Sequence, residues 1–212
     1  FLKKYLLYHI LIVILYVIMK KVLYPFYFYS ALAFTLLSSC ANFGDSLLYF
    51  NKNAKISKVK TVLYFNPEVF PDISEIKEAT YSAFYTATSD QMKSMGNLKY
   101  LKVDTPISFD DVDTGTVKEI CKNNNADIAV IPKVKYFKVG FGKYVFSNQV
   151  IVSMKLYNAE GDFVMEAAYD TYKGNGRLLG TAENSVIIGT KGALRKISKE
   201  LKNRSASTHK PI

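Results

Sequence analysis

The sequence predicts an α/β (α+β) domain built on a single mixed sheet, with its elements in the order β-α-β-α-β-β-β-α after an apolar leader. Three patterns favour this fold class. Two strand-like runs are each followed by a helical pattern, further strand-like runs then follow one another with only turns between them, and a final amphipathic stripe fits a covering helix. Strand–helix units followed by a meander pack into one sheet with helices laid against it.

The first strand–helix unit is predicted at residues 58–95. Residues 58–65 are rich in β-branched and aromatic side chains, as strands are, and prolines follow within a few residues. Asp72 then offers a helix N-cap, and apolar residues recur at spacings of three and four as far as Met95. Gly96 stops this helix, which is the longest helical signal after the leader.

A second unit and a meander follow. A short strand is predicted at residues 98–103 and a second helix at about 114–123. Strand patterns then cover residues 126–139, 150–157 and 163–169, and glycine-containing turns separate them. Because strands joined by short turns pair with their neighbours in opposite directions, we expect these three to form an antiparallel meander.

The last helix is predicted from Thr181, which can cap it, to about Leu201, with a stripe of apolar residues for burial. Gly189 and Gly192 lie inside this pattern and weaken the expectation of a continuous helix, because glycine is a poor helix former. We expect residues 203–212 to be a flexible tail.

Asp110, Asp111 and Asp113 precede the second helix, where carboxylates either cap the helix and complement its dipole or bind a cation. Capping is favoured, because calcium loops place oxygen ligands at regular spacing and no further acidic residue follows until Glu119. The glycines of residues 173–177 match neither the dinucleotide fingerprint nor the P-loop. We therefore expect an ordinary loop there, and the sequence predicts no metal site and no cofactor.

The apolar leader has the arrangement of a secretory signal. Met19 is followed by two lysines and by an apolar stretch over residues 22–37. A start at Met19 is the simplest interpretation, so we expect residues 1–18 to be an upstream extension outside the working protein and residues 19–39 to be the signal peptide. A pair of membrane helices is disfavoured, because each apolar run is shorter than the roughly 18–20 residues that span a bilayer.

Leu37-Ser38-Ser39-Cys40 ends the leader and resembles the lipobox of bacterial lipoproteins. The resemblance implies that diacylglycerol is attached to the Cys40 sulfur and that the chain is cleaved just before it. We therefore expect a lipid anchor at Cys40, a tether over residues 40–57 and a folded domain over residues 58–202. Ala41 stands in place of the aspartate that retains lipoproteins of some bacteria at the inner membrane, which implies the outer membrane, with the domain in the periplasm.

Composition disfavours several classes of enzyme. The chain has 212 residues with 28 Lys and Arg against 18 Asp and Glu, and its two histidines are His9 in the leader and His209 in the tail. Nucleophile systems that use histidine and His-ligated zinc sites need an imidazole in a folded pocket. Cys121 falls on the apolar face of a helical pattern and is expected to be a core residue, and with Cys40 lipidated no intramolecular disulfide is possible.

The element order, read with the lipobox, resembles a known family. The residues that carry the resemblance are Lys60 to Phe65, Ala126 to Ile131, and Val150 to Leu156, which leads through Asn158 to Gly161 into Phe163 to Tyr169. These resemble envelope lipoproteins whose domain is related to the amino-terminal domain of TolB, including the curli-secretion lipoprotein and the lipoprotein activators of peptidoglycan synthases. The resemblance implies a protein that binds other envelope proteins or assembles, with no catalytic residues.

Residues 133–146 form the most distinctive predicted surface, since four lysines interleave there with five aromatic residues. One interpretation is an ordinary hairpin whose lysines discourage edge-to-edge pairing. The other is a hairpin tip that docks on a protein partner or an anionic envelope polymer. The candidate partner-binding residues are Lys133, Lys135, Tyr136, Phe137, Lys138, Phe141, Lys143 and Tyr144.

The predicted function is that of a non-enzymatic envelope lipoprotein acting as adaptor, assembly factor or regulator. A subunit of a secretion pore is one alternative. An enzyme acting on an envelope polymer through carboxylates such as Asp127, Glu166 or Asp170 is another, and it would need two of them to converge in a cleft. The expected partners are the membrane, through the lipid, and another envelope protein, and we expect neither nucleic acid nor a small-molecule substrate.

Overall fold

The computed structural model describes Tyr16, Lys21 and residues 44–54, 56, 59–96, 98–138, 146–175 and 181–208. The chain divides into two units, residues 1–42 and 43–212, and the fold below is that of the second. Cys40 and the hairpin residues Phe141, Lys143 and Tyr144 lie outside the described residues. Within the part of the chain that is described, no helix combines the length and the apolar character needed to cross a membrane.

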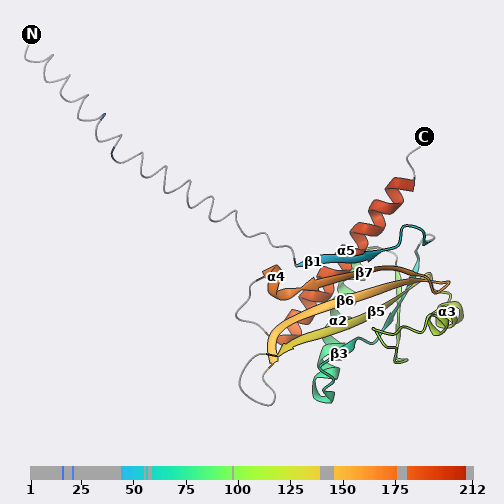
Figure 1. The fold of residues 1–212 in the computed structure, drawn as a ribbon, viewed down its shortest axis with the longest axis horizontal. Helices are drawn as coiled ribbons and strands as arrows, with labels where there is room; N and C mark the ends of the chain where they lie inside the picture. The colour runs from blue at the N-terminus through green and yellow to red at the C-terminus, as the bar shows by residue number, and fades with distance from the viewer. Residues whose placement is uncertain are drawn as a thin grey trace, which may run out of the picture. The chain divides into compact units, whose positions relative to one another are not determined.

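A seven-stranded mixed sheet carries the domain (Figure 1). Its strands are β1 (Asp45–Phe50), β2 (Thr61–Phe65), β3 (Glu68–Phe70), β4 (Lys99–Val103), β5 (Ile128–Lys138), β6 (Phe146–Asn158) and β7 (Phe163–Asp170). They lie in the order β1-β7-β6-β5-β2-β4, with β3 beside β5. β2 pairs in parallel with β4 and β5, β3 pairs in parallel with β5, and β5, β6, β7 and β1 form antiparallel pairs.

The described helices are α2 (Ser74–Ser94), α3 (Thr114–Asn123), α4 (Thr171–Asn175) and α5 (Ala182–Thr208). β2, α2, β4, α3, β5, β6, β7 and α5 follow one another as the sequence predicted, so the mixed-sheet α/β fold class is confirmed. β1, β3 and α4 are additional to the prediction. In Figure 1, α2 and α5 lie against one face of the sheet and α3 against the other.

Each face of the sheet buries its own apolar core. The larger core includes Phe84 of α2 and Leu194 of α5. The smaller core joins Val117 and Cys121 of α3 to Ile131 of β5. β5 therefore contributes to both cores, as expected of a central strand that is covered on two sides.

Residues 45–50 form a strand inside the predicted tether of residues 40–57, whose apolar residues Leu47 to Phe50 we expected to dock on the domain. This strand is β1, in which Asp45 lies opposite Tyr169 of β7. Leu47 and Phe50 pack against the larger core. The burial of these apolar side chains and the hydrogen bonds to β7 outweigh the turn-forming residues of the segment.

The ends of two helices also differ from the prediction. Ile73, not Asp72, is the N-cap of α2 and its side chain makes no capping bond, while Asp72 forms an ion pair with Lys77. α5 continues through Thr208, so the predicted flexible tail is helical over residues 203–208. Packing of its earlier turns against α2, β6 and β7 stabilises α5, and the polar residues that follow continue the same helix.

One local signal agrees with the prediction. Asp113 caps α3, since its side-chain Oδ1 accepts hydrogen bonds from the backbone N–H groups of Gly115 (2.9 Å) and Thr116 (3.3 Å). The hydrogen bond from the Thr116 hydroxyl, together with those from the two backbone N–H groups, holds the pKa of Asp113 below its ordinary value. The capping interpretation of this acidic residue is confirmed.

Candidate functional site

A cavity of about 440 Å³ opens at the carboxyl ends of β2 and β4. It is lined by Asn66, Pro67, Glu68, Val69, Phe70, Asp72, Lys77, Tyr81, Asp104, Pro106 and Ile107. After β2 the chain turns toward α2 on one face of the sheet, and after β4 it turns toward α3 on the other. Open α/β sheets bind ligands at such points, where connections from neighbouring strands part to opposite faces.

Asn66 ties the two walls of the cavity together. Its Nδ2 donates to Asp104 Oδ1 (3.3 Å), and its Oδ1 accepts from the Tyr85 hydroxyl (2.9 Å). Lys102 Nζ lies 3.1 Å from the same Asp104 oxygen. The hydrogen bond from Lys102 holds the pKa of Asp104 below its ordinary value, so Asp104 is ionised and paired with a lysine at neutral pH.

An aromatic ring borders the cavity on the side of β5. Phe70 of β3 is 51% exposed, although it is large and apolar. The ammonium of Lys135, a neighbour across the β3–β5 pairing, lies 5.8 Å from the centroid of this ring. Lys135, one of the lysines noted in the sequence, therefore lies beside the aromatic ring that borders the cavity.

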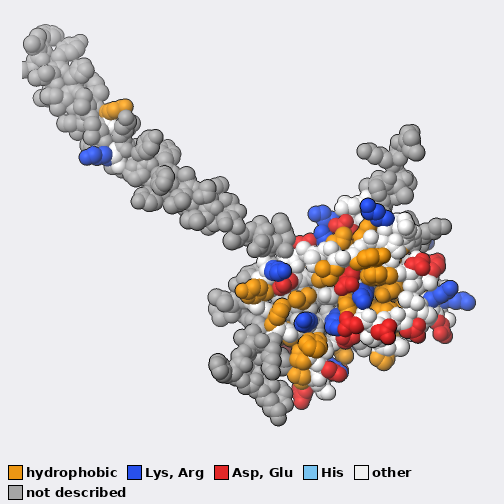
Figure 2. Space-filling model, in the orientation of Figure 1, with side chains coloured by type: hydrophobic (Ala, Val, Ile, Leu, Met, Phe, Trp, Pro, Cys, Tyr) orange, Lys and Arg blue, Asp and Glu red, His pale blue; other side chains and the backbone are white. Residues whose placement is uncertain are grey.

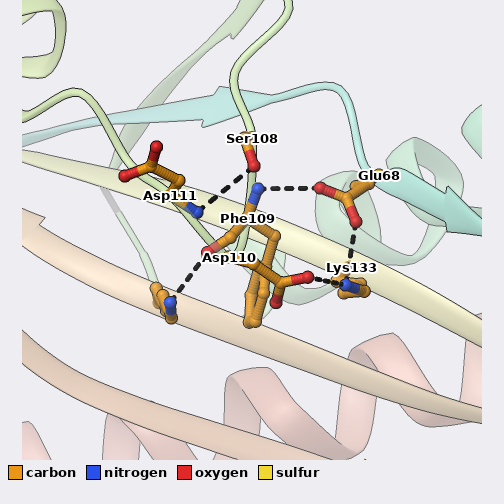
Figure 3. Close-up of polar contacts among 7 residues, drawn as sticks. Glu68, Ser108, Phe109, Asp110, Asp111 and Lys133 are labelled. Atoms are coloured by element: carbon orange, nitrogen blue, oxygen red, sulfur yellow. Dashed lines mark hydrogen bonds and ion pairs between the residues drawn. The ribbon is translucent and has the colours of Figure 1, made fainter.

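Lys133 joins β3 to the loop that follows β4 (Figure 3). Its Nζ lies 2.8 Å from Glu68 Oε1 and 2.6 Å from Asp110 Oδ2, and its side chain is only 17% exposed. Partial burial lowers the pKa of Lys133, but the hydrogen bonds to Asp110 and Glu68 outweigh it, and the pKa lies above its ordinary value. Lys133 therefore stays charged and holds the loop after β4 against β3.

Phe109 lies at the centre of this cluster and is buried. Its backbone N–H donates to Glu68 Oε2 (2.8 Å), and its carbonyl oxygen accepts from Lys155 Nζ (2.7 Å). The ammonium groups of Lys155 and Lys133 lie 4.6 Å and 5.6 Å from its ring centroid. As Figure 3 shows, the loop after β4 is fastened to the sheet by its backbone and by its ring.

Of the predicted partner-binding residues, Lys133, Lys135, Tyr136 and Phe137 have described side chains, and Tyr136 is buried apart from the two lysines. Val134 and Tyr136 belong to the larger core, and the Tyr136 hydroxyl lies 2.7 Å from that of Thr80. Lys135 is exposed and Phe137 is half-buried, while the side chain of Lys138 lies outside the described residues. The period of two along β5 turns alternate residues to opposite faces, so Tyr136 lies on the face opposite Lys133 and Lys135.

The carboxylates considered for an enzyme have separate positions. Asp127 accepts from the backbone N–H groups of Lys60 (2.7 Å) and Thr61 (2.8 Å). Asp170 accepts from the N–H groups that follow it at the start of α4. Asp127 precedes β5 at the end of the sheet where Ile128 pairs with the last residue of β6, whereas Asp170 pairs near the start of β6. These two carboxylates therefore do not converge.

The remaining groups considered from the sequence are buried to different degrees. Burial raises the pKa of Glu166, the charge of Asp110 adds to this effect, and Lys155 opposes it. Cys121 is fully buried in α3, which confirms it as a core residue. Burial, with smaller contributions from the charges of Glu160 and Asp127, raises the pKa of the Cys121 thiol to about 11. At neutral pH this thiol is protonated and weakly nucleophilic.

Replacing Lys133 by methionine is expected to destabilise the domain by about 1–2 kcal/mol. Charge-assisted hydrogen bonds contribute more than neutral ones, but Asp110 is largely exposed, which reduces its share. Lys135→Met is the matched control, two residues along the same strand, and should change stability by less than about 0.5 kcal/mol. Urea unfolding followed by circular dichroism measures both, and equal midpoints for the two variants would contradict the role given to Lys133.

No family model matches the chain, and no curated protein matches its sequence. Among solved structures, the PelC dodecamer from Paraburkholderia phytofirmans matches 71% of this chain and 94% of its own, with 11% identity and a TM-score of 0.46. Lipoprotein GNA1162 from Neisseria meningitidis matches 68% and 99%, with 8% identity and a TM-score of 0.29. The hypothetical protein CT253 from Chlamydia trachomatis matches 70% and 99%, with 9% identity and a TM-score of 0.36. The relation to the TolB amino-terminal domain stays a prediction.

Proposed function

We propose that the chain is a non-enzymatic lipoprotein of the bacterial envelope that binds a segment of another envelope protein, as adaptor, assembly factor or regulator. The observation that carries the proposal is the cavity at the carboxyl ends of β2 and β4, bordered by the exposed ring of Phe70. Cys40 supplies the lipid anchor, because it follows the apolar leader directly. Ala41 beside it favours the outer membrane, with the domain in the periplasm.

The charges around the cavity favour binding over acid–base chemistry. Each carboxylate that lines it has a lysine partner. The pairs are Glu68 with Lys133, Asp72 with Lys77, and Asp104 with Lys102. A general acid or base works best with a pKa near neutrality, whereas the pKa of Asp104 is held below its ordinary value by its lysine. Such pairs suit a polar rim that orients a partner.

Apolar groups inside this rim supply the surface that a partner would bury. Phe70, Pro67, Pro106 and Ile107 line the same cavity. Binding energy at protein interfaces concentrates on a few aromatic and apolar contacts surrounded by polar groups. On the face seen in Figure 2, hydrophobic side chains lie interspersed with basic and acidic ones, the mixture that non-obligate interfaces have.

Phe70→Asp is expected to lower recovery of the partner at least about tenfold, which corresponds to about 1.4 kcal/mol of binding free energy. The measurement is crosslinking in the envelope followed by affinity purification of the tagged full chain. Tyr172→Asp is the matched control, because Tyr172 is a similarly exposed aromatic (63%) on α4, outside the cavity. Recovery of the same partner at the same yield by both variants would overturn the assignment of the cavity.

A further inference from the structure

Two large apolar side chains are exposed next to each other on β1. Leu48 is 58% exposed and Tyr49 is 45% exposed. β1 is the last strand at its end of the sheet, and among the described strands it pairs only with β7. The register shifts between Leu47 and Tyr49, so Leu48 sits at a bulge, a feature that re-aims side chains at sheet edges. The edge therefore presents side chains outward at its centre.

This end of the sheet differs from the other. β4, at the opposite end, carries the exposed Lys99 and Lys102, which discourage the pairing of another strand. β1 has neither lysine nor proline, yet its bulge breaks the regular row of backbone groups that an added strand would need. β1 therefore presents apolar side chains to a partner and does not present the regular row of backbone groups that would pair with another strand.

The short segment between Cys40 and β1 indicates that Leu48 and Tyr49 lie near the membrane. Four residues separate Cys40 from Asp45, the first residue of β1. Five residue steps span at most about 18 Å when fully extended. If Cys40 carries the lipid, as the proposed function requires, the start of β1 stays within that distance of the membrane surface.

We propose that Leu48 and Tyr49 dock in the interfacial layer of the membrane that holds the lipid at Cys40. Tyrosine favours this layer, because its ring is apolar and its hydroxyl is polar. The ring of Tyr49 stacks on that of Phe163 at 4.6 Å with an interplanar angle of 7°, and Phe163 packs in turn against Tyr157 at 5.2 Å. Aromatic packing thus holds the Tyr49 side chain in place before it meets the membrane.

Charge supports the same contact. Without the four lysines of residues 1–39, the 28 Lys and Arg of the chain become 24, against 18 Asp and Glu. A domain with this excess of positive charge is attracted to anionic phospholipids over roughly a Debye length, about 8–10 Å. The lipid anchor, the basic charge and the apolar pair on β1 then act together to orient the domain on the membrane.

Tryptophan fluorescence tests this contact directly, because the chain contains no Trp. The full chain, purified from cells with its lipid, carries either Tyr49→Trp or Phe70→Trp and is reconstituted into vesicles of phosphatidylethanolamine and phosphatidylglycerol. A second set of vesicles contains lipids brominated on the acyl chain, which quench tryptophan on contact. We expect a blue shift and several-fold stronger quenching for Tyr49→Trp than for Phe70→Trp, whose residue lies at the cavity, separated from β1 by β7, β6 and β5.

Flotation of the vesicles separates the failure of this inference from the failure of the anchor. Protein that does not float with the vesicles overturns the anchor at Cys40 and this inference with it. Protein that floats but shows equal quenching at the two positions leaves the anchor standing and overturns the docking of β1. A blue shift at Tyr49→Trp that grows with protein density and is insensitive to bromine would assign the patch to a second copy of the chain, and it also overturns the membrane contact.

Discussion

Cys40→Ala is expected to abolish the incorporation of labelled palmitate into the protein and to release the domain from the membrane. Only Cys40 and Cys121 carry thiols in this chain. Cys121 is fully buried and its pKa is raised to about 11, so it cannot substitute as the lipid-bearing residue. Loss of the anchor leaves only weak interfacial contacts, which do not hold a protein stably at a bilayer.

Cys121→Ala is the matched control and should label as strongly as the wild type. Labelling of Cys40→Ala at the level of the wild type would refute the anchor. Density-gradient fractionation of the labelled wild type then tests the finer placement, which predicts that it migrates with outer-membrane markers. Migration with inner-membrane markers would contradict the inference drawn from Ala41.

Gly192→Ala is expected to destabilise the domain by about 2 kcal/mol, although alanine is the better helix former by about 1 kcal/mol. A Cβ atom on Gly192 would lie 2.0 Å from Cδ2 and 2.4 Å from Cγ of Tyr169. Gly192 thus allows α5 to lie close against β7, and an added methyl group forces the helix or the ring to move. For a domain of this size the thermal midpoint should fall by about 4–8 °C.

The clash with Tyr169 can be isolated by a double-mutant cycle. In a Tyr169→Ala background the cost of Gly192→Ala should largely disappear, because the atoms that it meets are gone. Asn184→Ala, at an exposed position of the same helix, is a control that should change stability by less than about 0.5 kcal/mol. A Gly192→Ala variant as stable as this control would show that the contact is not restrictive.

The sequence was sufficient to predict those helices and strands whose ends depend on neighbouring residues in the chain. The predicted helix at 114–123 coincides with α3, because Asp113 caps it and its apolar positions repeat with the helical period. β1 could not be predicted in this way. Its strand conformation comes from pairing with β7, and Asp45 and Tyr169 are far apart in the sequence. The two glycines of α5 look like weak points in a helix until the sheet beneath them is known.

The candidate site was less accessible to sequence reasoning than the fold. Asn66 and Asp104 meet only because β2 and β4 pair in parallel, and nothing in either segment signals the other. Lys133 was predicted as a docking residue from its place among aromatics, but its partner Glu68 comes from β3 and its partner Asp110 from the loop after β4. A period of two shows which residues share a face and leaves open what covers that face.

The strand order also fixes the width of the molecule between its two proposed contacts. β1 and β4 are separated by five strand spacings, and at about 4.8 Å each these amount to roughly 24 Å. With β1 on the lipid, the cavity lies near the opposite edge of the sheet from the membrane contact. The paired strands then keep the distance between the cavity and β1, the strand in contact with the bilayer, nearly constant. A flexible linker could not do this.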